Sequence, residues 1–184
     1  MPFKKINIEK FCNHKLIFEN LPVQEERFGI DNICVLKENF EISKKLKKGD
    51  LEIDYSLGRN DNIICNSQRI KINQRVKRLH MVGFAYWGDA CENLKIIYED
   101  NTECWIELTF IDWSCSYKSR LTEGHDPENQ KMIEDIQVMI SSGEWVHLIY
   151  FHDFICELNE QKAVKEIILP DNILIHIFAI TAEY

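Results

Sequence analysis

The segment from Gln68 to Trp113 constrains the fold most, because apolar and polar side chains alternate along nearly all of it. Successive side chains of a β-strand point to opposite faces, so a period of two is typical of strands. The run from Cys104 to Trp113 shows this period clearly and predicts a strand with one apolar face. The side chains of that face are Cys104, Ile106, Leu108 and Phe110.

A second run lies just before it and predicts a hairpin. Every second residue from Leu94 to Tyr98 is apolar within the run Glu92–Asp100. The two runs meet at Asp100-Asn101, a pair that tolerates positive φ and therefore suits a tight turn between antiparallel strands.

The longest predicted strand is Val76–Trp87, and both of its faces are apolar. We therefore expect it to be central and buried on both sides. Gly83 and Ala85 leave little side chain on one of these faces, which predicts that another part of the chain packs close to the backbone there.

Shorter alternating runs separated by turn residues continue over the rest of the chain, as in sandwiches. One stretch differs, because the apolar residues of Gln130–Ile140 have helical spacing. The prediction is an all-β, antiparallel jelly-roll β-sandwich with one short helix, in a single domain over residues 1–184. The other predicted strands are Lys4–Ile8, Ile33–Leu36, Phe40–Ser43, Leu51–Tyr55, Asn62–Asn66, Gln68–Gln74, Trp145–Cys156, Ala163–Leu169 and Ile173–Glu183.

The net charge and the cysteines limit which partners and which cellular compartment are expected for this chain. The formal net charge is −8, and the basic runs Lys44–Lys48 and Arg69–Arg78 fit a loop and a solvated strand face, so no nucleic-acid partner is expected. No apolar run approaches ~18 residues, and no membrane partner is expected. The seven cysteines include no Cys-x-x-Cys pair, which favours unpaired thiols in a reducing cytoplasm.

Several short motifs resemble those of jelly-roll domains in the galactose-binding-like superfamily. They cover about residues 60–113 and 145–182, and more weakly the first 50. The motifs mark turns and core strands. They are Asn60–Cys65, Gln68–Ile70, Leu79–Gly83, Ile96–Asp100, Ile111–Trp113, Ile168–Asn172 and His176–Thr181.

This resemblance implies a β-sandwich of two antiparallel sheets. Domains of this kind are often appended to glycoside hydrolases, where they bind carbohydrate or pack against the catalytic domain. A non-catalytic, carbohydrate-binding-like module is the first hypothesis. The alternatives are a protein-interaction or self-associating sandwich, with a homo-oligomer as one form, and a small sugar-active enzyme. No nucleophile elbow, P-loop or dinucleotide-binding motif is present to favour an enzyme.

Sugar binding requires a flat aromatic ring to stack on the C–H face of a pyranose, with polar groups for its hydroxyls. Aromatic and polar residues gather at predicted strand ends, where loops of a jelly roll converge. The alternative is that Trp87 and Trp113 cap the core. The candidate ligand-binding residues are Trp87, Trp113, Tyr86, Tyr117, Arg59, Asp89 and Asp112.

Metal and cofactor sites are weakly indicated. No His-x-His pair exists for a cupin-like metal centre. His80 and His176 lie among apolar residues, which favours hydrogen-bonded core histidines that could meet across neighbouring strands. No cofactor is predicted, and a structural calcium ion is the one candidate, with ordinary turn chemistry as the alternative. The candidate calcium ligands are Asp50, Asp54, Asp61 and Asn62.

Overall fold

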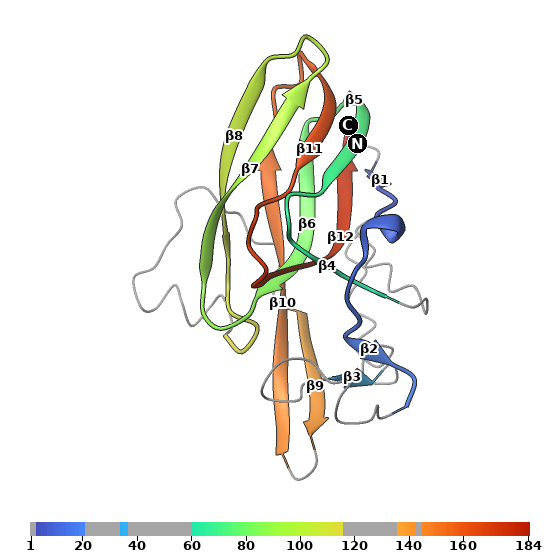
Figure 1. Ribbon diagram of the computed structural model, residues 1–184, viewed down its shortest axis with the longest axis vertical. Helices are drawn as coiled ribbons and strands as arrows, with labels where there is room; N and C mark the ends of the chain where they lie inside the picture. The colour runs from blue at the N-terminus through green and yellow to red at the C-terminus, as the bar shows by residue number, and fades with distance from the viewer. Residues whose placement is uncertain (1–2, 21–33, 37–59, 116–135, 143–144) are drawn as a thin grey trace.

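The computed structural model describes residues 3–20, 34–36, 60–115, 136–142 and 145–184. These residues form mostly antiparallel strands in two sheets packed face to face, with a single 3-10 turn, η1 (Glu9–Phe11), as their only helical segment (Figure 1). The chain is therefore an all-β sandwich, as the alternating pattern predicts.

The larger sheet has the order β1-β12-β6-β10-β9, with β4 also paired to β12. Its strands are β1 (Phe3–Lys5), β4 (Ile63–Ile64), β6 (Arg78–Ala85), β9 (Ile136–Ser142), β10 (Trp145–Glu157) and β12 (Ile175–Glu183). The smaller sheet has the order β5-β11-β7-β8. Its strands are β5 (Arg69–Arg75), β7 (Ala90–Tyr98), β8 (Glu103–Phe110) and β11 (Ala163–Ile168). The chain crosses repeatedly between the two sheets, which is jelly-roll connectivity.

Strand β6 is central and buried on both faces, as predicted. Leu79 and Met81 lie in the core between the two sheets. Val82 and Phe84 point to the opposite face, where they join a second apolar cluster. That cluster includes one residue from each strand of the short parallel pair β2 (Ile17–Phe18) and β3 (Val35–Leu36).

The close approach predicted at Gly83 is also confirmed. A Cβ atom added there would lie 2.2 Å from the carbonyl oxygen of His176 on β12. The register of β12 shifts between Ile177 and Ala179, so a bulge lies directly beside this contact. The predicted hairpin turn is confirmed as well, because Asn101 adopts φ 62° between β7 and β8.

The predicted helix at Gln130–Ile140 is wrong over its last five residues, which belong to strand β9; residues 130–135 lie outside the described part. β9 pairs antiparallel with β10, from Ile136 opposite Phe151 to Ser142 opposite Trp145. A short apolar run fits either period, and here the partner strand decides between them. Together β9 and the first half of β10 extend away from the sandwich (Figure 1).

Other boundaries shift by a few residues. The first strand ends at Lys5, and the chain then enters the η1 turn. The strands predicted at Phe40–Ser43 and Leu51–Tyr55 lie outside the described residues. Among the residues that are described, no helix is long and apolar enough to cross a membrane.

Candidate functional site: an aromatic stack at one end of the sandwich

Three aromatic rings gather where β6 ends. Tyr86 stacks with Trp87, with 5.9 Å between ring centroids and 22° between planes. It also stacks with Trp113, at 6.4 Å and 23°. Tyr86 is only 7% exposed and belongs to the second apolar cluster, whereas Trp87 is 63% exposed. The buried tyrosine therefore anchors the stack, and Trp87 presents open ring surface to solvent.

The backbone of Trp87 is in an unusual conformation. Its φ is +69°, in the left-handed region that bulky residues rarely adopt, and Gly88 follows with φ +107°. A non-glycine residue held there costs on the order of 1–3 kcal/mol and persists only where surrounding contacts impose it. Such outliers cluster at binding sites, which makes Trp87 a functional candidate.

Asp112 holds the peptide group that follows Trp87. Its carboxylate accepts a 2.6 Å hydrogen bond from the Gly88 N–H and a 2.9 Å bond from the Ser114 N–H. The Ser114 hydroxyl donates to the same carboxylate. The Asp112 N–H donates in turn to the Asp89 carboxylate at 2.9 Å. Asp112 thus ties the Trp87 loop to the segment that follows β8.

That segment is fixed between two strands of the larger sheet. Its backbone runs parallel to the end of β6, where the Ala85 N–H donates to the Ile111 carbonyl at 2.8 Å. The Trp113 N–H donates to the Ala85 carbonyl at 2.9 Å, and the Trp113 carbonyl accepts from the Tyr150 N–H of β10 at 2.8 Å. Trp113 therefore lies between β6 and β10, at the point where β10 has left its pairing with β6.

Five of the seven predicted ligand residues come together here: Tyr86, Trp87, Asp89, Asp112 and Trp113. Arg59 and Tyr117 lie outside the described residues. The Asp89 and Asp112 carboxylates both accept hydrogen bonds from backbone N–H groups within the loops. Contact between the rings and a ligand stays a prediction.

Sequence reasoning missed Ile173, which is 68% exposed. It lies in the turn before β12, one residue before Leu174, whose carbonyl accepts the Tyr86 N–H at 2.8 Å. Ile173 and Trp87 therefore flank the same backbone hydrogen bond. The turn signal Pro170-Asp171-Asn172 just before it could have shown that an isoleucine at 173 lies on a loop.

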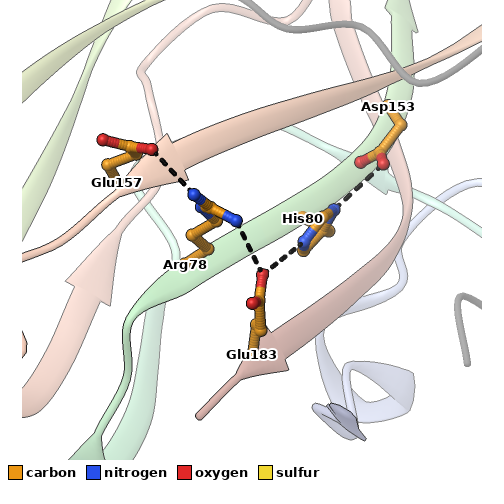
Figure 2. A network of polar contacts seen from close by, with 5 residues as sticks. All are labelled: Arg78, His80, Asp153, Glu157 and Glu183. Carbon is orange, nitrogen blue, oxygen red and sulfur yellow. Dashed lines mark hydrogen bonds and ion pairs between the residues drawn. The ribbon is translucent and has the colours of Figure 1, made fainter. Parts of the chain in front are cut away.

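His80 lies at the buried end of a separate polar network (Figure 2). Its Nδ1 is 3.0 Å from Asp153 Oδ2, and its Nε2 is 3.6 Å from Glu183 Oε2. Arg78 reaches both Glu183, at 3.5 Å, and the exposed Glu157, at 3.1 Å. His80 is 4% exposed, so this network links strands β6, β10 and β12 rather than facing a substrate.

His176 is the second predicted core histidine, and its Nδ1 lies 2.9 Å from Asn62 Oδ1. Burial lowers the pKa of His176 to about 3, with a further contribution from nearby His14. Both histidines are hydrogen-bonded core residues, as predicted. The idea that they could meet is wrong, because β12 places Thr181 opposite His80 and His176 opposite Phe84.

Asp61 and Asn62, two of the four candidate calcium ligands, form hydrogen bonds within the protein. The Asp61 carboxylate accepts hydrogen bonds from the Leu16 and Ile17 N–H groups and from Asn62 Nδ2. Burial raises the pKa of Asp61, although these hydrogen bonds oppose that shift. Asp50 and Asp54 are outside the described residues. Over the part of the chain that is described, no three His, Cys, Asp or Glu residues are grouped to hold a metal ion.

No protein-family model matches this sequence, and no curated protein matches it. The class that the structure itself defines is an antiparallel β-sandwich with an aromatic stack at one end.

Proposed function

We propose that this chain is a non-catalytic carbohydrate-binding module whose binding surface is the Tyr86–Trp87–Trp113 stack. The observation that carries the proposal is Trp87 itself. The residue is 63% exposed, its backbone has a positive φ, and the N–H of the next residue, Gly88, is bound by the Asp112 carboxylate.

The geometry suits the C–H face of a sugar ring. One face of the Trp87 ring stacks on Tyr86, while the residue as a whole is largely exposed. A preorganised ring loses little conformational entropy on binding, which favours recognition of a flat, weakly hydrophobic surface. Asp89 and Ser114 are exposed in the adjoining loops and would offer polar groups to sugar hydroxyls.

The test is calorimetric titration of the protein with neutral mono- and oligosaccharides. We expect binding by the native chain and at least a tenfold loss of affinity in Trp87→Ala. Trp105→Ala is the matched control, because Trp105 is 60% exposed on β8, away from the stack, and its loss should leave affinity unchanged. Absence of binding by every saccharide, or equal losses in both variants, would contradict the proposal.

A further inference from the structure

We infer that two copies of this chain stack through the outer face of the smaller sheet, related by a two-fold axis parallel to its strands. The outer face is the one turned away from the larger sheet. It carries cations on one edge strand, carboxylates on the other and apolar side chains between them, so it is complementary to itself. The residues that define it are Arg69, Lys71, Ile97, Glu103, Trp105 and Ile168.

The strand registers place these side chains on one face, in two rows. Ile168 of β11 lies opposite both Arg69 of β5 and Lys95 of β7, and Lys95 lies opposite Trp105 of β8. Residues directly opposite one another in an antiparallel pair share a face, so this row crosses the whole sheet. The next row along the strands, in the same strand order, is Lys71, Glu166, Ile97 and Glu103.

Side-chain contacts agree with this placement. Lys95 Nζ lies 5.0 Å from the centroid of the Trp105 ring and 2.8 Å from Glu103 Oε2. Arg69 forms an ion pair with Glu166 on the neighbouring strand. Trp105 is nevertheless 60% exposed and the Arg69 side chain 61% exposed, so both can make further contacts.

A two-fold axis parallel to the strands reverses the strand order and keeps each position along the strands. It therefore places β5 of one copy over β8 of the other. Lys71 then faces Glu103 of the second copy, and Arg69 faces Trp105 of the second copy. Opposite charges attract, and a guanidinium over an indole ring is also attracted.

The alternative axis, across the strands, is disfavoured by charge. It would lay β5 over β5 and so bring Lys71 and Arg69 against the same cations of the second copy. The axis parallel to the strands avoids this repulsion. Ile97 and Ile168, on the two inner strands, lie near that axis, where the second copy would remove them from water.

The expected dimer is weak. Strands spaced about 4.8 Å apart put β5 and β8 only roughly 14 Å apart. Such a face is small beside the roughly 800 Å² that each partner contributes to a standard interface, so we expect a Kd on the order of 10–100 μM. Sedimentation velocity of the full chain, at concentrations below and above this Kd, should show a monomer that converts to a dimer.

Two tryptophan variants test which surface associates. Trp105→Ala should weaken association at least tenfold, because it removes the largest exposed side chain of the face. Trp87→Ala is the matched control, since Trp87 is 63% exposed but lies at the end of β6, and it should associate like the native chain.

A charge exchange tests the axis. Lys71→Glu and Glu103→Lys each put like charges opposite one another across the axis, so each variant alone should stay monomeric while circular dichroism shows it folded. An equimolar mixture of the two should restore the dimer, because every facing pair then has opposite signs. A native chain that stays monomeric, equal losses in Trp105→Ala and Trp87→Ala, or a mixture that fails to associate would each overturn this inference. None of these outcomes bears on saccharide binding, which is measured separately.

Discussion

The Gly88 N–H donates a 2.6 Å hydrogen bond to the Asp112 carboxylate, across 24 residues of sequence. Asp112 is 8% exposed and accepts from Ser114 as well, so one carboxylate holds two loops together. The contact fixes the peptide group that follows the left-handed backbone of Trp87.

Replacing that carboxylate should loosen the loop. In Asp112→Ala the Gly88 and Ser114 N–H groups lose their acceptor, and we expect a loss of about 1–3 kcal/mol in the free energy of unfolding. Urea denaturation measures this change. Asp171→Ala is the control, since Asp171 is exposed, and should change stability by less than about 0.5 kcal/mol. Equal effects of the two substitutions would contradict the assigned role of Asp112.

Trp87→Gly should separate binding from stability. The change relieves the positive φ but removes the ring stacked on Tyr86, and these effects oppose each other. We expect unfolding free energy to change by less than about 1 kcal/mol, where loss of a core tryptophan costs about 3–5 kcal/mol. Saccharide binding should be lost. A loss of stability typical of a core residue would show that Trp87 caps the core instead.

Gly83→Ala should destabilise the fold strongly, for a steric reason. The new Cβ would meet the His176 carbonyl at 2.2 Å, and backbone on both strands would have to move. We expect a loss of at least about 3 kcal/mol, or no folded protein, by circular dichroism and thermal melting. Gly88→Ala is the contrasting case, because nothing lies within 4 Å of its Cβ and only the positive φ is strained. That variant should fold and lose about 1–2 kcal/mol.

Acid should destabilise the fold through His176. Its pKa is about 3 in the folded chain and 6.5 for a histidine side chain fully exposed to water, so between these values the unfolded state binds the extra proton. Stability contributed by the neutral ring is therefore present above about pH 6.5 and falls by about 1.4 kcal/mol per pH unit on acidification toward pH 3. The raised pKa of Asp61 acts in the opposite direction.

A variant of His176 isolates the contribution of this histidine to the pH dependence of stability. His176→Gln keeps a hydrogen-bonding side chain but does not titrate, so its unfolding free energy should depend less on pH between about 6.5 and about 4.5. Chemical denaturation at several pH values measures the slope. An unchanged slope would show that other groups cause the acid sensitivity.

Asp153 and Glu157 belong to the same polar network (Figure 2), but replacing them should lower the free energy of unfolding by unequal amounts. Asp153→Ala removes the buried partner of His80, and we expect a loss of about 2–4 kcal/mol. Glu157→Ala removes the exposed partner of Arg78 and should cost less than about 1 kcal/mol. Thermal melting of both variants tests the difference, and a larger loss from Glu157→Ala would reverse the assignment.

Local alternation was enough to predict the sandwich, the central strand and the hairpin at Asn101. It failed at Ile136–Ile140, because a short apolar run has no preferred period until β10 pairs with it. The close contact at Gly83 was predictable, since a glycine inside a buried strand signals an approaching backbone.

The sequence indicated which aromatic residues meet at the end of β6, but not how the loops around them are held. Aromatic residues near strand ends pointed to Tyr86, Trp87 and Trp113. Sequence could not show that Asp112 binds the Gly88 N–H, because that bond depends on how the segment after β8 passes the end of β6. Ile173 was missed because its partner loop is distant in sequence.

The peptide groups of Trp113 hydrogen-bond to β6 on one side and to β10 on the other. The β9–β10 arm and the aromatic stack are consequently joined through the backbone of a single residue, where β10 parts from β6.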